Sequence, residues 1–210
     1  LREFCASAGG GAIGECGLDG SDGFPPIEAQ LPIFEAQMRV AVSLKKPLFL
    51  HVRSAHEAFM AAVQRVADAC GSAGCAATPL GVPMVVHCFT GPIDELRDYV
   101  AIGCHISLSG YVIKKKPAEA IRTALAEGII PRDRLMIETD APFMGNKGCR
   151  RRGPNPHTRS ESPNPPCSIY MVLEKVAEAL GEKPEEVSRF TVENTLRFFG
   201  IGGGAPATGA

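Results

Sequence analysis

Residues 135–143 read LMIETDAPF, an apolar run that ends in acidic residues and is closed by a proline. Short apolar runs bounded by turn-forming residues are typical of buried strands in a parallel sheet. Three other stretches follow the same design: AIGECGLD places Glu15 behind apolar residues, PLFLH ends at His51 and PMVVH ends at His87. Several strands that each deliver one metal-competent side chain predict a site shared between strands.

Around these stretches, strand patterns alternate with helix patterns along the chain. Residues 27–41 carry apolar side chains at the spacing of one helical face. Ser54 and Glu57 match the S-x-x-E pattern of a capping box, which predicts a helix start after the strand that holds His51. Five strands alternating with helices predict a parallel α/β sheet.

The position of the polar residues narrows the fold class. In a (β/α)8 barrel, the catalytic side chains come from the carboxyl ends of several strands, because these ends meet at one mouth. Glu15, His51, His87 and Asp140 all follow predicted strands in this way. We therefore expect an α/β fold of the TIM-barrel type, with one domain over residues 1–200 and a disordered low-complexity tail, IGGGAPATGA, at its end.

The composition excludes some classes of protein. Hydrophobic residues make up 45% of the chain and charged residues 21%, as in soluble globular domains, and no apolar run approaches the roughly 20 residues that span a bilayer. We find no secretory signal and expect the eight cysteines to be reduced thiols, so we predict an intracellular, cytoplasmic protein. The net charge of −1 means that a nucleic acid would be bound by local basic runs.

The spacing of the four residues favours a metal site. Glu15, His51 and His87 follow one another at intervals of 36 residues, about one strand–helix unit, and Asp140 comes 53 residues later, enough for two units. Histidine nitrogen and carboxylate oxygen together suit zinc, manganese or magnesium. A lone histidine at a strand end is more often structural, and a lone acid is more often a helix cap. Four such residues at equivalent strand ends favour the metal interpretation.

The motifs GECGLD, LHVR, VVHCFTG and ETDAP occur in this order, and NTLRFFG follows near the end. Over residues 1–200 the chain resembles the TatD-related metal-dependent deoxyribonucleases of the amidohydrolase superfamily. The resemblance implies a (β/α)8 barrel, one or two divalent metal ions and phosphodiester hydrolysis of DNA, often from the 3′ end. It implies that Glu15 bridges both metals and that His51 and His87 complete one site. Asp140 would hold the other metal and act as general base.

One departure from the family pattern is large. The family begins with a strand that carries an H-x-H pair, and this sequence contains no such pair. The resemblance starts in the helix before the family's fourth strand, so we expect a truncated barrel with the last five strand–helix units. The activity of the parent protein and the activity of this chain are therefore separate questions.

Two residues are predicted to bind substrate. Arg53 lies two residues beyond His51 on the same face of the strand, where it would grip a phosphate, or it is a surface residue near a helix start. Asn164, in SPNPP, resembles the family's Asn-x-Pro and would order a loop over the mouth or make a turn. The runs 114–116 (KKK) and 150–152 (RRR) would add positive potential at the mouth, or form a solvated face.

Three functional hypotheses remain open at this point. The first is a metal-dependent deoxyribonuclease, which the basic runs favour. The second is a metal-dependent hydrolase of another substrate, such as a lactone, an amide or a phosphotriester. The third, favoured by the missing H-x-H strand, is a non-catalytic remnant that binds nucleic acid or a protein partner.

Overall fold

The computed structural model describes residues 11–71, 78–145 and 164–201 of the chain. Five parallel strands form one sheet in which each strand pairs with the next along the sequence, so the predicted alternation of strands and helices is confirmed. Within the described residues, β1 and β5 are the two edges of this sheet. The strands are β1 (Ile13–Asp19), β2 (Leu48–Arg53), β3 (Met84–Val86), β4 (His105–Leu108) and β5 (Leu135–Ile137).

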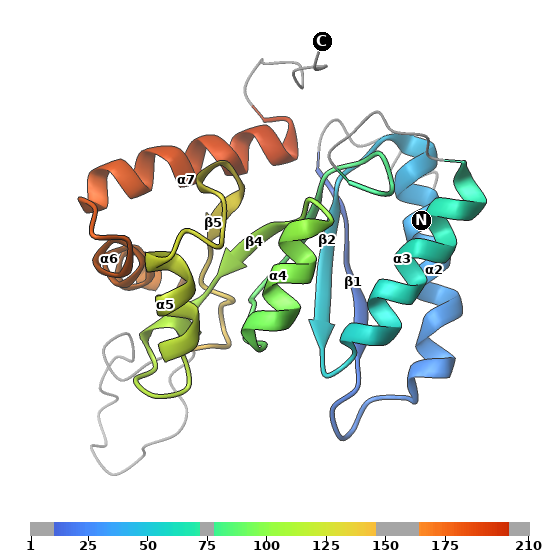
Figure 1. Ribbon diagram of the computed structural model, residues 1–210, viewed down its shortest axis with the longest axis horizontal. Helices are drawn as coiled ribbons and strands as arrows, with labels where there is room; N and C mark the ends of the chain where they lie inside the picture. The colour runs from blue at the N-terminus through green and yellow to red at the C-terminus, as the bar shows by residue number, and fades with distance from the viewer. Residues whose placement is uncertain (1–10, 72–77, 146–163, 202–210) are drawn as a thin grey trace.

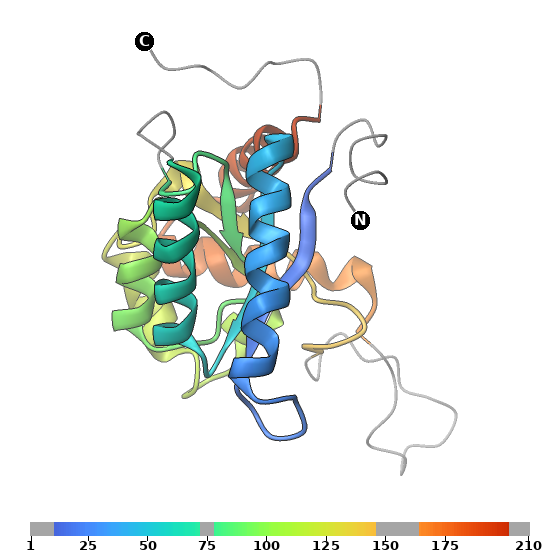
Figure 2. The ribbon, with the colours of Figure 1, turned by 90° about the vertical axis from the view of Figure 1, so that its right-hand side faces the viewer.

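The helices surround the outer side of the curved sheet, as Figures 1 and 2 show. Each crossover between neighbouring strands carries a helix because parallel strands cannot be joined by a tight turn. The apolar faces of these helices pack on the sheet and form the main core. The helices are α2 (Ile27–Leu44), α3 (His56–Cys70), α4 (Ile93–Ala101), α5 (Glu119–Ala126), α6 (Ile169–Leu180) and α7 (Pro184–Phe199).

Helix α7 packs against the end of the sheet at which the strands begin. The Phe199 ring lies 6.3 Å from that of Phe49, the second residue of β2, and the Phe198 ring lies 5.2 Å from His105, the first residue of β4. The buried Asn194 amide donates to the carbonyl of Leu135, the first residue of β5, at 2.8 Å. These contacts leave the opposite, carboxyl end of the sheet for the site.

The predicted capping box at Ser54 is wrong. Helix α3 begins at His56 behind Ala55, and no side chain caps it. Ser54 has a left-handed backbone, with φ of +49°, because the chain must reverse direction directly after Arg53. The start of the helix is held instead by a contact of His56 Nε2 with Asp98 Oδ2 on α4, at 3.0 Å.

Two further expectations concern the whole chain. None of the helices in the described ranges is long and apolar enough to cross a membrane. Five cysteines fall within these ranges and all five are free thiols. The predicted low-complexity tail and the Arg150–Arg152 run fall almost entirely outside the described residues.

Candidate metal centre

Three of the predicted ligands meet at the carboxyl end of the sheet. Glu15 comes from β1, His51 from β2, and His87 directly follows β3. One carboxylate oxygen of Glu15 lies 3.0 Å from His51 Nδ1 and 2.8 Å from His87 Nε2. The three potential ligand atoms all lie within 4.8 Å of one another. Residues 36 and 72 positions apart in the sequence therefore share one point in space.

Strand register explains how these side chains converge. Neighbouring residues on parallel strands face the same side, and Gly17 of β1 is the partner of His51 on β2. The register shifts between Ile13 and Cys16, which marks a bulge in β1. Glu15 lies within this bulge. A side chain at Gly17 would collide with the carbonyl of His51, so glycine at this position permits the close approach of β1 to β2.

The donor set and its dimensions fit a divalent cation. One carboxylate oxygen and two imidazole nitrogens are ligands that zinc and manganese accept readily. Ligand atoms about 2.1 Å from a tetrahedral ion lie roughly 3.4 Å from one another, and the three atoms here need only small shifts to reach that spacing. The Glu15 side chain is half exposed, so the centre is open to a substrate. The geometry therefore fits the prediction that these three residues hold a metal ion.

Each histidine of the centre has a second carboxylate on its other ring nitrogen. The Nε2 atom of His51 lies 3.0 Å from Asp19 Oδ2, and the Nδ1 atom of His87 lies 3.6 Å from Glu138 Oε2. Such partners orient a metal-binding imidazole and strengthen it as a ligand. Glu138 is itself held because its other oxygen accepts a hydrogen bond from the backbone N–H of Cys88.

Asp19 and Glu138 are functional candidates that the sequence analysis missed. Both lie within motifs that were singled out, GECGLD and ETDAP. Glu138 lies two residues before Asp140, and side chains two apart on an extended segment share one face. Alternation along the strand was therefore the signal that could have placed Glu138 beside the site.

The electrostatics of these carboxylates differ. Burial would raise the pKa of Asp19, but hydrogen bonds from Ser21 and His51 outweigh burial and hold that pKa below its ordinary value. Burial alone would lower the pKa of His87, but the carboxylates of Glu138 and Glu15 outweigh it and raise that pKa. A cation at the centre would therefore compete with a proton for His87.

Asp140 lies beside the three-residue cluster without joining it. It follows β5 with a left-handed backbone, φ of +55°, and its Oδ2 atom lies 3.5 Å from Cys88 Sγ. Burial, together with the charges of Glu138 and Glu15, raises the pKa of Asp140. Burial and the neighbouring carboxylates also raise the pKa of the Cys88 thiol to about 12, so the thiol donates to Asp140. The ligand and general-base roles of Asp140 stay predictions.

The two predicted substrate-binding residues have different surroundings. Arg53 is exposed at the end of β2, and no described residue forms an ion pair with its guanidinium. Asn164 is buried, and its amide donates to the carbonyls of Thr139 at 2.8 Å and Phe143 at 2.7 Å. The amide oxygen of Asn164 accepts from Ser168. The two bonds of the amide group tie Asn164 to the loop around Asp140, and the bond from Ser168 ties it to the start of α6, which suits the loop-ordering alternative.

The model of the family described as TatD related DNase matches residues 1–200 of the chain. The chain belongs to this family. It is 35% identical over 190 residues to the 3′-5′ ssDNA/RNA exonuclease TatD of Citrobacter rodentium, and the match covers 90% of the chain and 65% of that protein. With the protein of the same name from Enterobacter lignolyticus it shares 36% identity, covering 90% of the chain and 66% of the relative.

Solved structures of the TatD family agree with the fold. The crystal structure of YjjV, a TatD homolog from Escherichia coli K12, superposes with a TM-score of 0.71 at 26% identity, covering 91% of this chain and 64% of that one. The five parallel strands and their helices are thus part of the TIM-barrel architecture of the family, as expected from the sequence. The chain spans about 65% of the length of the curated relatives that it matches.

Proposed function

We propose that the chain belongs to a metal-dependent nuclease that hydrolyses phosphodiester bonds of single-stranded DNA from the 3′ end. The contact of one Glu15 oxygen with both His51 and His87 is the observation that carries this proposal. Family membership and the activity named for the bacterial relatives support the choice of substrate. The chain itself spans about 65% of the length of those relatives.

Each residue of the centre would have a separate role. Glu15, His51 and His87 would hold a divalent cation, and Asp19 would keep the His51 ring oriented through its contact at 3.0 Å. The cation, when bound, supplies Lewis-acid chemistry and makes water a better nucleophile at neutral pH. Magnesium, manganese and zinc are all compatible with this set of donors.

Asp140 would act as the general base. Its raised pKa brings the carboxylate closer to the range in which it can both accept and release a proton near neutral pH. The Cys88 thiol and the Asn164 amide would keep the Asp140 loop in place, since one contacts the carboxylate and the other the loop backbone. Asn164 is then a positioning residue.

Arg53 would bind the phosphate that is cleaved. It ends the strand that carries His51, its side chain is exposed, and a guanidinium can form two parallel hydrogen bonds with a phosphate. An Arg53→Ala variant should therefore bind DNA more weakly while its metal affinity is unchanged.

The test is cleavage of 5′-labelled single-stranded DNA by the chain with Mg²⁺ or Mn²⁺, read as a ladder of products. We expect shortening from the 3′ end and at least a 100-fold loss in Asp140→Asn, since a positioned base contributes about 10²–10⁴-fold. The matched control is Asp133→Asn, an exposed aspartate before the beginning of β5. Full activity in Asp140→Asn would contradict the assigned role.

The same assay addresses the two other hypotheses. Hydrolysis of a lactone or amide without cleavage of DNA would favour another substrate class. Metal binding and DNA binding without any hydrolysis would favour the non-catalytic remnant. In that case Glu15, His51 and His87 would hold the metal, and Asp140, which lies outside this group, would not act as a base.

A further inference from the structure

A second basic feature lies outside the metal centre, on the loop that follows β4. The short helix η1 (Gly110–Ile113) leads from this strand into Lys114, Lys115 and Lys116, which are all exposed. No described carboxylate forms an ion pair with any of the three lysines. Three adjacent like charges repel one another, so a structure that keeps them together and unpaired leaves them available to an anion.

Arg122 on α5 holds the backbone of this loop in place. Its guanidinium donates to the carbonyl of Val112 at 2.9 Å and to that of Lys114 at 2.7 Å, and it also donates to the carbonyl of Lys115. These bonds hold the backbone of the loop against α5. The lysine side chains therefore project from a rigid support rather than from a free loop, which reduces the entropy lost on binding.

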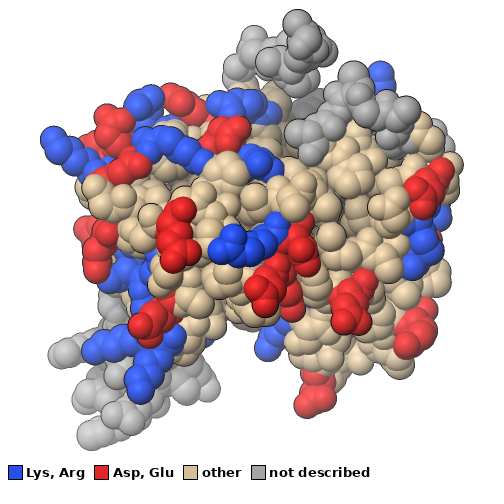
Figure 3. Space-filling model, viewed as in Figure 1, with Lys and Arg blue, Asp and Glu red and all other residues tan. Residues whose placement is uncertain are grey.

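The loop borders a hollow between α5 and α6 with a volume of about 650 Å³. Lys115, Lys116, Arg122 and Lys175 line it together with two carboxylates, those of Glu119 and Glu178. Figure 3 shows basic side chains gathered at the lower left of the molecule, where Figure 1 draws α5. Lys175 is already paired with Glu178 at 2.6 Å, and Arg122 is used to hold the loop, so we call the three exposed residues Lys114, Lys115 and Lys116 the lysine surface.

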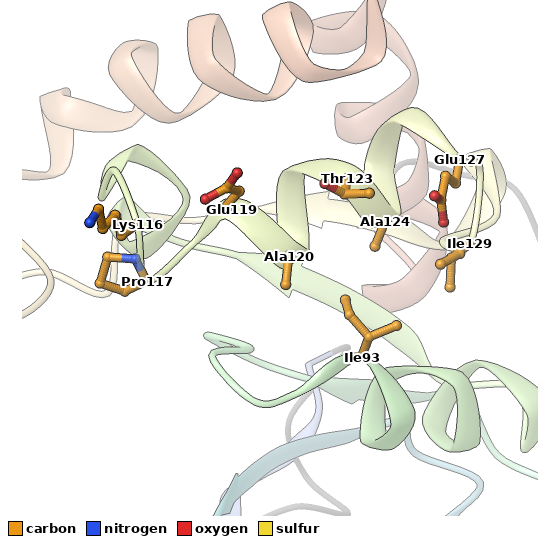
Figure 4. A pocket seen from close by; sticks show the side chains of 9 residues that line it. All are labelled: Ile93, Lys116, Pro117, Glu119, Ala120, Thr123, Ala124, Glu127 and Ile129. Atoms are coloured by element: carbon orange, nitrogen blue, oxygen red, sulfur yellow. The ribbon is translucent and has the colours of Figure 1, made fainter.

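A neighbouring hollow of about 430 Å³ lies between α4 and α5 and is mostly apolar. Figure 4 shows Lys116 and Pro117 at one end of it and Glu127 with Ile129 at the other. Lys116 lines both hollows and is the cation that lines the mostly apolar one.

The lysine surface is connected to the site through Ser109. The Ser109 hydroxyl lies 3.1 Å from Cys88 Sγ, which contacts Asp140, and Ser109 also caps η1. The four residues of η1 rise about 2 Å each, so the first lysine begins roughly 8 Å from that contact. The axial rise of about 3.4 Å for each phosphate holds for one strand of a stacked duplex, and an unstacked strand is more extended, so roughly 8 Å corresponds to at most about two nucleotides.

We propose that the lysine surface binds the phosphates of a single-stranded nucleic acid whose end is cleaved at the metal centre, beginning within about two nucleotides of the contact between Ser109 and Cys88 beside that centre. This inference rests on the proposed function and adds to it a second contact along the strand. Long substrates should then bind better than short ones, because only long strands reach from the metal centre to the lysine surface.

The experiment measures binding of fluorescein-labelled single-stranded DNA of 12 and 3 nucleotides by anisotropy, in EDTA so that no cation contributes. The test variant is Lys114→Gln/Lys115→Gln/Lys116→Gln. The matched control is Lys45→Asn/Arg97→Gln/Lys183→Gln, which removes three exposed cations elsewhere. Asparagine suits Lys45 because this residue has a positive φ of 53°.

For the 12-mer we expect the slope of log K against log salt to fall in magnitude by about 2 in the test variant, about 0.7 for each lost phosphate contact. The control should keep the slope of the unaltered chain, and the 3-mer should show a smaller change in slope than the 12-mer, because it has fewer phosphates for the three lysines. Equal slopes in the test and control variants would overturn the inference.

The two proposals fail in different ways. If the unaltered chain binds the 12-mer through these lysines but cleaves no DNA with Mg²⁺ or Mn²⁺, the proposed function is wrong and the binding surface is retained. If it cleaves DNA and the lysines leave the slope unchanged, the function stands and this inference is wrong.

Discussion

The candidate site lies at the carboxyl end of the sheet, and its two halves are built differently. On the side of β1 to β3, Glu15, His51 and His87 contact one another directly through one carboxylate oxygen. On the side of β5, Glu138 and Asp140 reach the cluster only through His87 and Cys88. The first half holds the three candidate ligands, and the second holds the carboxylate behind His87 and the proposed general base.

The same difference continues on the outside of the sheet. The strands β1 and β2 lie against α2 and α3, whose inward side chains are fully buried. Beside β5, an apolar hollow of about 390 Å³ lies between α6 and α7, and Tyr170, Val192 and Leu196 remain exposed there. We therefore expect metal binding to depend on the half of the molecule whose core is fully packed.

The largest effect should follow from removing the shared oxygen. Glu15→Ala takes away the carboxylate oxygen that lies within hydrogen-bond distance of both histidines, and we expect the affinity for Mn²⁺ or Zn²⁺ to fall at least about 1000-fold, beyond the 10–100-fold loss typical of an outer partner. Calorimetric titration of the metal measures this. If Asp140→Ala weakened binding more than Glu15→Ala, the contrast between the two halves would be wrong.

The difference in packing predicts different stability effects. Leu50→Ala empties a fully buried position in β2 and should lower the free energy of unfolding by about 3 kcal/mol. Leu196→Ala, at a position that is 40% exposed beside β5, should lower it by less than about 1 kcal/mol. Urea denaturation compares the two variants. A similar loss in both would show that the hollow beside β5 is filled in solution.

The carboxylates behind the histidines should differ in importance. Asp19→Asn removes a charged partner 3.0 Å from His51, and we expect metal affinity to fall about 10–100-fold. Glu138→Gln changes a partner at 3.6 Å, beyond good hydrogen-bond distance, and the loss should be smaller. The same metal titration ranks them, and the reverse order would contradict the assignment of Glu138 to the second half.

The last prediction concerns the pH dependence of stability and rests on His105 of β4, the strand that joins the two halves. Burial lowers the pKa of this histidine to about 4, whereas in the unfolded chain it is about 6.5. Between these two pKa values the unfolded chain is protonated at His105 and the folded chain is not. The stability that comes from keeping His105 neutral is therefore complete above pH 6.5 and is lost as the pH falls toward 4.

We expect the loss to be about 2–3 kcal/mol between those pH values, since each unit of difference in pKa is worth about 1.4 kcal/mol. His105→Gln should flatten the dependence of the urea midpoint on pH over this range, with the unaltered chain as reference. An unchanged dependence would show that His105 is protonated in the folded chain at pH 5.

The strand ends were the part of the site that could be predicted. Apolar runs such as PLFLH and PMVVH identify the strands, and the polar residue that ends each run must lie at the carboxyl edge of a parallel sheet. The cap at Ser54 could not be predicted because it depends on a left-handed backbone at that residue. The support of His51 by Asp19 depends on distances between strands that no local pattern contains.

By itself, the sequence determined the order of strands and helices and the four candidate side chains, because apolar periodicity is a local property of the chain. The expectation that all four end their strands is wrong in part: His87 and Asp140 follow β3 and β5, whereas Glu15 and His51 lie within β1 and β2. Only the tertiary structure decided that three of these four meet at one oxygen while Asp140 lies beside them. The physical reason is that the bulge in β1 and the register of β1 on β2 place side chains to within an ångström, whereas a sequence pattern places them only on a face.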